Sequence, residues 1–224
     1  MSTTSDIDRI LSTQSAVDVT RNDYGVEITN TQGLKFSHSF MNGPYPRRAR
    51  QSNQALLKAC QNKQRNIHSI LDLTGGWGVD SFILAHHGQQ VHMIEQNPLL
   101  WAIVAQSLSV LQENSPALAA RLSSELCDGL SYLRTGSAEQ AYDCIYIDPM
   151  FPAHKSSAKP GKELQILQSL TDNSDIEACF QLALEKAVKR VVVKRPAKAS
   201  SLDGKKPDII YREKTIRFDV YLSR

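Results

Sequence analysis

The strongest constraint on the fold is the alternation of short apolar runs with segments of helical period from Ser69 onward. Five runs have the length and residue types of buried strands: "SILDL", "QQVHMI", "SSEL", "YDCIYI" and "RVVVKRP". The segments between them place apolar residues three and four positions apart, which is typical of amphipathic helices. Strands and helices that alternate in this way predict a parallel sheet with helices on both faces.

The ends of several elements are also marked in the sequence. Gly88 is placed to end the helix after the first strand. Asn97 and Pro98 have the residue types of a helix N-cap and a first helical residue. The helix of a later segment begins at Asp175, and "DIIYREKTIRFDVYL" predicts two strands in an antiparallel hairpin. These elements predict an α/β, Rossmann-like fold with a mainly parallel seven-stranded sheet that ends in a hairpin.

The first 50 residues have a different pattern. "VDVTRNDYGVEITN" contains two alternating runs around a turn at Asn22, Asp23 and Gly25, which predicts a pair of strands. "GPYPRRARQ" follows and is predicted to be a basic loop because of its Gly and Pro content. We therefore expect a β-rich segment over residues 1–50, and a second, larger domain over residues 51–224 that begins with a helix from Asn53 to Lys63.

Composition narrows the class of protein. A chain of 224 residues with 41% hydrophobic content can bury one sizeable core. No apolar run approaches a membrane span, and the polar start "MSTTSDIDRI" does not resemble a signal peptide, so a cytoplasmic location is expected. Four separated cysteines and six histidines form no metal-ligand pattern, so no metal is expected. The oligomeric state stays open.

The charges are unevenly distributed. The net charge is +4 over residues 1–66, −7 over residues 67–150 and +6 over residues 151–224. Two basic segments around an acidic one are compatible with a polyanionic partner. A solvated lysine surface explains the same numbers, and from charge alone it is the favoured explanation.

The carboxyl ends of the predicted strands are where such sheets bind ligands. After the first strand, Gly75, Gly76 and Gly78 predict a tight turn that lets backbone approach a ligand, although glycines also end strands for structural reasons. The turn fits neither a phosphate-binding P-loop nor the dinucleotide fingerprint. Glu95 follows the second strand, about 20 residues past the glycines, where a carboxylate can accept both hydroxyls of a ribose. Gln96 would line the same rim.

Asp128 and Gly129 follow the third strand. The carboxylate of Asp128 could accept a hydrogen bond from an adenine amino group, with Gly129 leaving space beside it. A simple Asp-Gly turn is the alternative.

The stretch "DPMFP", residues 148–152, follows the fourth strand. An aromatic amino group is a poor nucleophile because its lone pair is delocalised into the ring. The Asp148 carboxylate and a rigidly held Pro149 carbonyl could accept its two N–H groups and favour the pyramidal form. Phe151 would stack on the base. The alternative is a strand-ending Asp-Pro turn with Phe151 in the core.

Basic residues gather around the same strand ends. Lys194 and Arg195 end the fifth strand, Lys155 follows the "DPMFP" stretch, and Arg47 and Arg48 lie in the predicted N-terminal loop. Phosphate contacts of this kind position a nucleic acid without reading its sequence. We therefore predict these five residues to contact RNA.

The order of glycine turn, Glu95, Asp128 and Asp-Pro-x-Phe is similar to that of class I S-adenosylmethionine-dependent methyltransferases. "DPMF" resembles the (D/N)PP(F/Y) motif of enzymes that methylate exocyclic amines. The longer stretches "DPMFP", "QSL", "RVVVKRP" and "RFDVY" resemble the 16S ribosomal RNA guanine-N2 methyltransferase family, ribosomal small subunit methyltransferase J, from about Phe40 onward. Val79 and Gln96 depart from that family, which has arginine at both positions.

The resemblance implies S-adenosylmethionine as cofactor and N2 of a guanine as the methyl acceptor, in 16S rRNA or a precursor of the small ribosomal subunit. It implies cofactor contacts at Val79, Asp80, Glu95, Gln96, Asp128, Gly129 and Asp148. Three further cofactor residues are predicted at the end of the first strand and in the turn that follows it: Asp72, Gly76 and Gly78.

Three other functions remain open on the residues alone. The same motif could serve an adenine-N6 methyltransferase acting on DNA or RNA. A glycine turn followed by an acidic residue also suits an NAD-dependent oxidoreductase, and the basic segments suit an RNA-binding module without activity.

Overall fold

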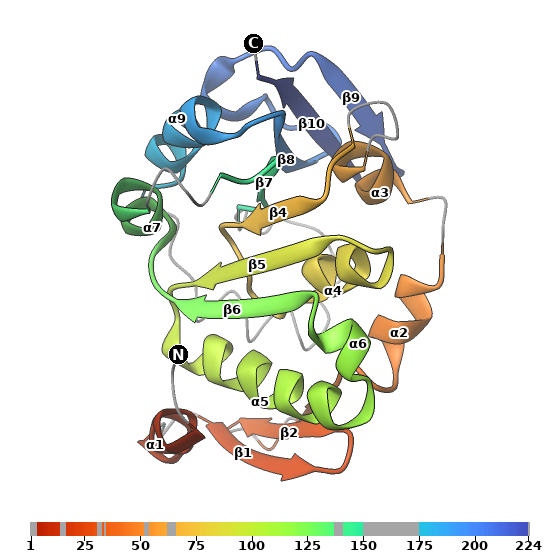
Figure 1. Cartoon of the computed structure of the whole chain (residues 1–224), viewed down its shortest axis with the longest axis vertical. Coiled ribbons are helices and arrows are strands. Elements are labelled where there is room, and N and C mark those ends of the chain that lie inside the picture. Colours follow the sequence, from red (N-terminus) through yellow and green to blue (C-terminus); the bar gives the residue numbers. More distant parts are fainter. Residues whose placement is uncertain are drawn as a thin grey trace.

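The computed structural model describes residues 4–13, 17–30, 33, 35–51, 54–61, 66–136, 141–149 and 175–223. These residues form one sheet of seven strands with helices on both faces, and a smaller antiparallel sheet beside it (Figure 1). The seven strands are β4 (Ser69–Asp72), β5 (Gln90–Glu95), β6 (Leu122–Leu126), β7 (Cys144–Ile147), β8 (Arg190–Pro196), β9 (Ile209–Arg212) and β10 (Ile216–Leu222).

The strand order of the larger sheet is β6-β5-β4-β7-β8-β10-β9. The five strands from β4 to β8 are parallel, and β10 runs antiparallel to both of its neighbours, β8 and β9. The predicted Rossmann-like fold with a C-terminal antiparallel hairpin is thus confirmed. The order turns back between β4 and β7, which makes the carboxyl ends of these two strands the place to look for a ligand site.

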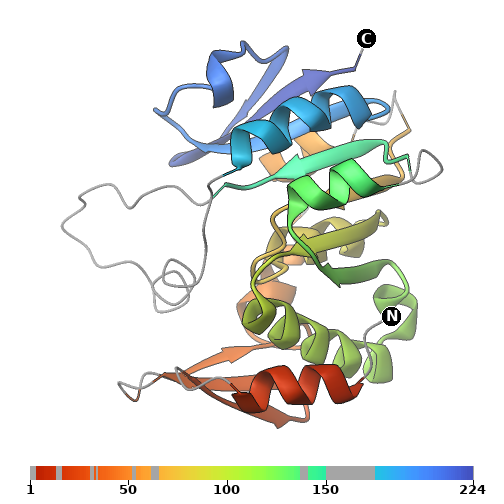
Figure 2. The ribbon, with the colours of Figure 1, turned by 90° about the vertical axis from the view of Figure 1, so that its left-hand side faces the viewer.

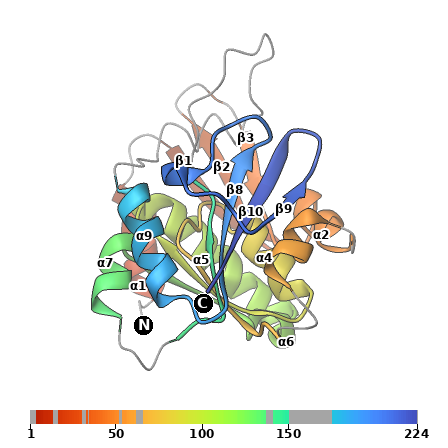
Figure 3. The same ribbon diagram turned by 90° about the horizontal axis from the view of Figure 1, so that it is seen from above.

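Side chains that alternate along the strands build a core on each face of this sheet. Ile70, Tyr146 and Val192 join one core, whereas Leu71 and Ile145 join the other. The first core includes α3 (Ala55–Cys60), α4 (Val79–His86) and α5 (Pro98–Asn114). The second includes α7 (Gly129–Thr135) and α9 (Ile176–Lys186). Figure 3 shows the sheet between α7 and α9 on one side and α4 on the other.

The predicted helix ends are largely present. Asn97 is the N-cap of α5, and its side chain accepts hydrogen bonds from the N–H groups of Leu99 and Leu100 at 2.9 and 3.1 Å. Gly88 follows α4 with φ +98°, a left-handed conformation that suits glycine. Two short helical turns complete this part of the chain, α6 (Pro116–Ala119) and η1 (Leu202–Gly204).

The N-terminal part contains the predicted strands and more. β1 (Val17–Asn22), β2 (Gly25–Asn30) and β3 (Lys35–His38) form an antiparallel sheet in that order, preceded by α1 (Thr4–Thr13). Val26 and Ile28 of β2 pack with Leu100 and Ile103 of α5. Figure 2 shows α1 and the small sheet together at one end of the molecule, against α5. The sequence did not predict α1 or β3.

The expectation of a basic loop over residues 43–51 was wrong, because residues 44–49 form the helix α2 (Pro44–Ala49). Pro44 and Pro46 lie in the first turn of α2, where a missing N–H leaves no helical hydrogen bond unmade. Tyr45 and Ala49 are buried on its inner side. Arg47 and Arg48 are therefore carried by a helix. Among the described helices, none has the length and apolar content of a membrane span.

Candidate active site at the strand ends

The turn between β4 and α4 depends on glycine at two positions. Gly76 and Gly78 have φ values of +51° and +66°, in the left-handed region. A Cβ on Gly78 would also lie 3.1 Å from the ring of Phe40 and 3.2 Å from the Met93 sulfur. The N–H of Gly78 donates to the carbonyl of Gly75 at 2.7 Å, which closes the turn. Gly78 is therefore packed beneath Phe40 and Met93, whereas Gly75 and Gly76 are partly exposed at the strand end.

Glu95 lies beside this turn at the end of β5 and is only 7% exposed. Its Oε2 accepts from the N–H of Gly76 and its Oε1 from the N–H of Asn97, both at 2.7 Å. Burial raises the pKa of Glu95, and the hydrogen bonds from these N–H groups partly oppose the increase. The two N–H groups hold the carboxylate in one orientation, and each oxygen keeps a lone pair for a ligand hydroxyl.

Asp128 and Gly129 lie at the start of α7, a helix that the sequence did not predict. Asp128 is its N-cap, and its Oδ1 accepts from the N–H of Ser131 at 2.9 Å. The hydrogen bonds at Ser131 lower the pKa of Asp128. A Cβ on Gly129 would lie 3.2 Å from the carbonyl oxygen of Leu73, so the close approach of these two segments requires a glycine. Instead of a simple Asp-Gly turn, the pair forms a helix start beside the end of β4.

Asp72, a predicted cofactor residue, is buried and directed toward the turn that follows it. Its Oδ1 accepts from the N–H and the hydroxyl of Thr74 at 3.0 and 3.2 Å, and its Oδ2 from the hydroxyl of Ser81 at 2.6 Å. The Thr74 hydroxyl in turn accepts from the N–H of Asp148 at 2.7 Å. Thr74 therefore joins the glycine turn to the end of β7. The sequence analysis missed it, although a hydroxyl residue directly before two glycines was visible there.

Asp72 predicts a pH dependence of folding. Burial raises the pKa of Asp72 to about 7, against hydrogen bonds from Ser81 and Thr74 that lower it. A carboxyl in an unfolded chain titrates near pH 4. Folding raises this pKa, so the folded protein binds the proton of Asp72 more tightly than the unfolded chain does. The contribution of this proton to the free energy of unfolding is therefore fully present below pH ~4, and it is lost as the pH rises through about 7.

The variant Asp72→Asn cannot titrate at this position. We expect its free energy of unfolding to fall less than that of the wild type between pH ~4 and ~7, measured by urea unfolding at a series of pH values. Asp18→Asn, at an exposed position of β1, is the control and should leave the wild-type pH dependence in place. Equal slopes for wild type and Asp72→Asn would contradict the prediction.

Asp148 and Asp80 share the ammonium group of Lys194. The Nζ of Lys194 lies 2.7 Å from Asp148 Oδ2 and 2.8 Å from Asp80 Oδ2. The hydroxyl of Tyr146 donates to Asp80 Oδ2 at 2.7 Å, and Arg48 lies 4.0 Å from Asp80 Oδ1. Lys194 was predicted to contact RNA, and the structure places its ammonium between two carboxylates instead of on an open surface.

The charges in this cluster perturb one another. Burial raises the pKa of Asp148; the Lys194 ammonium opposes this increase and the Asp80 charge adds to it. Burial also acts to raise the pKa of Asp80, but Lys194, Tyr146 and Arg48 together lower it. Burial alone would lower the pKa of Lys194. The two carboxylates outweigh this effect, so the pKa lies above its ordinary value. The two carboxylates thus favour the charged form of Lys194.

The remaining predicted residues divide between the site and its surroundings. Pro149 is buried next to Asp148, Val79 is half-buried in the first turn of α4, and Gln96 is exposed between β5 and α5. Phe151 and Lys155 lie outside the described residues.

The two arginines of α2 and Arg195 differ in exposure. Arg47 and Arg48 are exposed, whereas Arg195 is 8% exposed and donates from Nε and Nη2 to the carbonyl of Ser200 at 2.9 and 2.7 Å. Arg48 lies 4.0 Å from Asp80, and the RNA contacts of Arg47 and Arg48 stay predictions. The RNA contact of Arg195 stays a prediction, and its guanidinium supports the loop after β8.

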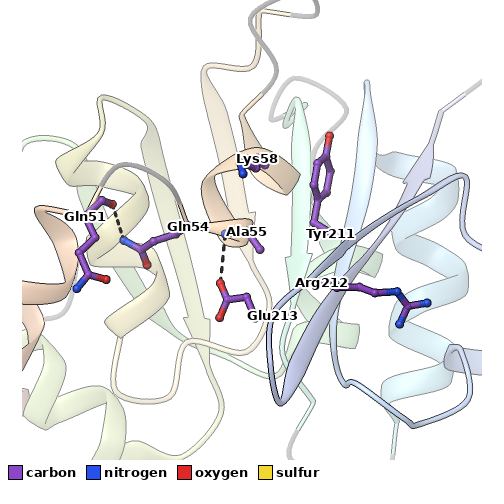
Figure 4. Close-up of a pocket in the computed structure, with 7 residues that line it drawn as sticks. All are labelled: Gln51, Gln54, Ala55, Lys58, Tyr211, Arg212 and Glu213. Carbon is purple, nitrogen blue, oxygen red and sulfur yellow. Dashed lines mark hydrogen bonds between the residues drawn. The ribbon is translucent and has the colours of Figure 1, made fainter.

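A polar groove lies between α3 and β9, shown in Figure 4. In it, Glu213 Oε1 accepts from the N–H of Ala55 at 3.2 Å, and the Gln54 side chain donates to the carbonyl of Gln51 at 2.8 Å. Its lining comprises Gln51, Gln54, Ala55, Lys58, Tyr211, Arg212 and Glu213. No predicted site residue lines it, so the strand ends of β4, β5 and β7 remain the candidate active site.

The chain matches the family described as "Putative SAM-dependent methyltransferase" over residues 11–223. Ribosomal RNA small subunit methyltransferase J of Coxiella burnetii (strain Dugway 5J108-111) is 39% identical over 171 residues, which are 76% of this chain and 66% of that protein. The match thus spans slightly less than two thirds of the length of that relative. The protein of the same name in Legionella pneumophila subsp. pneumophila is 39% identical over 180 residues, 80% of this chain and 72% of that protein.

Solved structures share the fold. A SAM-dependent methyltransferase from Neisseria gonorrhoeae superposes with a TM-score of 0.74 at 24% sequence identity, covering 99% of this chain and 92% of that one. An rRNA methyltransferase from Streptomyces viridochromogenes superposes with a TM-score of 0.50 at 14% identity, over 80% of this chain and 85% of that one. At these identities the likeness concerns the arrangement of strands and helices.

Proposed function

Because the chain belongs to the family of S-adenosylmethionine-dependent methyltransferases, we propose that it methylates the exocyclic N2 of a guanine in 16S ribosomal RNA. The observation that carries the proposal is the position of Asp148. Its backbone N–H is bonded to Thr74 of the glycine turn, and its carboxylate is held by Lys194. An acceptor for an amino group thus lies at the same sheet edge as Glu95.

The residues at this edge fit the cofactor of the family. Glu95 presents a buried, fixed carboxylate where a ribose diol can be bound, and the left-handed Gly76 beside it carries no side chain of its own. Because residue 129 is a glycine, the start of α7 can lie close to the backbone of Leu73, at the same edge of the sheet. When bound there, S-adenosylmethionine supplies a methyl group activated by its sulfonium. We propose Glu95 as the ribose ligand and Asp128 as the residue nearest the adenine.

The chain's own residues would prepare the attacking amine. The Asp148 carboxylate, with one oxygen on Lys194, can accept an N–H of the guanine amino group with the other. The Pro149 carbonyl would accept the second N–H, and Phe151 would stack on the base. Acceptors on both N–H groups favour the pyramidal form of the amine, in which the attacking lone pair is localised on nitrogen. They also stabilise the positive charge that develops on that nitrogen. The extra proton then leaves to Asp148 or to water.

The relatives support the proposed substrate. Proteins named ribosomal RNA small subunit methyltransferase J are 39% identical to this chain over most of its length. The acceptor loop alone suits any exocyclic amine, so guanine rests on the resemblance to this family. We further propose 16S rRNA, free or in a small-subunit precursor, as the partner, the cytoplasm as the location, and Arg47 and Arg48 as phosphate contacts.

Transfer of a labelled methyl group tests the proposal. Small-subunit RNA or particles that lack the modification are incubated with the protein and labelled S-adenosylmethionine, and the product nucleoside is identified by mass spectrometry. N2-methylguanine is the expected product, and fully modified RNA serves as the matched control that should accept no label. N6-methyladenine would favour the adenine alternative, and no transfer to either RNA would reject the proposed function.

A further inference from the structure

We propose that Lys194 is a positioning residue for methyl transfer: its ammonium, bonded to Asp80 and Asp148 together, aims the Asp148 carboxylate at the substrate amine. The inference deepens the proposed function and rests on it. It assigns to Lys194 a role other than the RNA contact that the sequence suggested.

The sheet itself brings Lys194 to Asp148. β7 and β8 are parallel neighbours, and Ile147 lies beside Val193, so the next residue of each strand is Asp148 and Lys194 respectively. The Lys194 side chain is 18% exposed, and two of its three N–H donors are used at 2.7 and 2.8 Å. Little of this ammonium remains for a phosphate.

Asp80 gives the second half of the argument. It is the second residue of α4 and therefore belongs to the turn side of the site, whereas Asp148 belongs to the acceptor side. Two carboxylates that share one cation lie too close for both to stay ionised when that cation is removed. Lys194 thus keeps the Asp148 carboxylate ionised and able to accept a hydrogen bond. The same ammonium also joins Asp148 to Asp80 of α4, on the cofactor side of the site.

The groups around Asp148 come from five elements. Those that face it or its immediate partners are Arg48 of α2, Asp72 of β4, Asp80 of α4, Tyr146 of β7 and Lys194 of β8, and a sixth element, α3, contributes the buried thiol of Cys60 beside Asp80 and Tyr146. Arg48 is the nearest other cation in this set, and it is 4.0 Å from Asp80. Among the described residues, removal of Lys194 therefore leaves Asp148 without an ion-pair partner and leaves Asp80 with Arg48 alone, at 4.0 Å.

The variant Lys194→Met tests the role directly. Loss of the cation raises the pKa of the Asp148 carboxyl and also frees its side chain from the orientation that faces the amine, so kcat at pH 7 is expected to fall about 10-fold or more. The KM for RNA should change less than about threefold, and the acid limb of the pH–rate profile should move to higher pH. Lys194→Arg should retain more activity because it keeps a cation.

A double variant separates charge balance from RNA contact. Asp80→Asn in the Lys194→Met background removes the repelling carboxylate and should return part of the lost kcat. Lys186→Met, an exposed lysine at the far end of α9, is the matched control and should leave kcat and KM unchanged. A rise in KM for RNA with kcat unchanged in Lys194→Met, or no recovery in the double variant, would overturn the proposal.

A measurement that requires no catalysis tests the role of Lys194 independently of the substrate. Carbon-13 NMR of labelled aspartate carboxyls, with Asp148 assigned from Asp148→Asn, should show Asp148 titrating at higher pH in Lys194→Met than in the wild type. Calorimetric binding of S-adenosylmethionine confirms that the variant is folded. If the wild type methylates no small-subunit RNA, the proposed function fails; an unchanged Asp148 titration would reject the role of Lys194 separately.

Discussion

Replacing Asp148 by asparagine is expected to lower kcat for methyl transfer about 10²- to 10³-fold. Asparagine keeps the shape of the side chain but loses the negative charge that faces the developing cation on the amine. It also places an amide NH2 group near Lys194, where the carboxylate now accepts at 2.7 Å. Single-turnover transfer of labelled methyl to unmodified small-subunit RNA measures the effect without a contribution from product release.

The control for this variant lies at the other end of the same strand. Asp143 precedes β7 and accepts from the N–H groups of His68 and Ser69, far from the glycine turn along the sheet. Asp143→Asn should therefore alter stability without lowering kcat by more than about threefold. A wild-type single-turnover rate in Asp148→Asn would show that the acceptor has been assigned to the wrong residue.

Replacing Glu95 by glutamine is expected to weaken S-adenosylmethionine binding about 10- to 100-fold. Each hydrogen bond to a charged group contributes about 1.5–3 kcal/mol, and the amide offers one acceptor oxygen where the carboxylate offers two. One of the N–H groups of Gly76 and Asn97 would then face an NH2 group instead of an oxygen. Isothermal calorimetry of cofactor binding measures the change.

The same variant should also be less stable by about 1–3 kcal/mol, because one buried N–H loses its partner. Glu113→Gln is the matched control: Glu113 forms an exposed pair with Arg21, and such pairs contribute about 0–1 kcal/mol. Unchanged cofactor affinity in Glu95→Gln would remove Glu95 from the cofactor site, whatever the effect on stability.

The larger sheet could be predicted from the sequence because its signals are local. Strand runs such as "RVVVKRP" alternate between two cores, as Val192 and Val193 do, and the Asn97 cap depends on neighbours two and three residues away. The helix α2 was missed because its Gly and Pro content is also typical of loops. Its two prolines lie in the first turn, where a helix accepts them. The choice of a helix over a loop depends on the burial of Tyr45 and Ala49 against the rest of the protein, which is not a local signal.

The connections of the site could not be predicted in the same way. The partners of Lys194 are 46 and 114 residues away, and Thr74 meets Asp148 across 74 residues. Only the pairing of β7 with β8 and of β4 with β7 brings these groups together. Residue types at strand ends therefore predicted that Glu95 lies beside the glycine turn, and the roles of these residues stay predictions. They did not predict that Asp72 faces inward and that Lys194 faces two carboxylates.

The hydroxyl of Thr74 has a consequence for how the affinities of two ligands depend on each other. It is bonded to Asp72 at the start of the glycine turn and to the amide of Asp148. A ligand that shifts the turn therefore also shifts the group that receives the amine. Under the proposed function, thermodynamic reciprocity requires the two affinities to change by the same factor: RNA binding at Asp148 should alter the affinity for the methyl donor as much as the donor alters the affinity for the RNA.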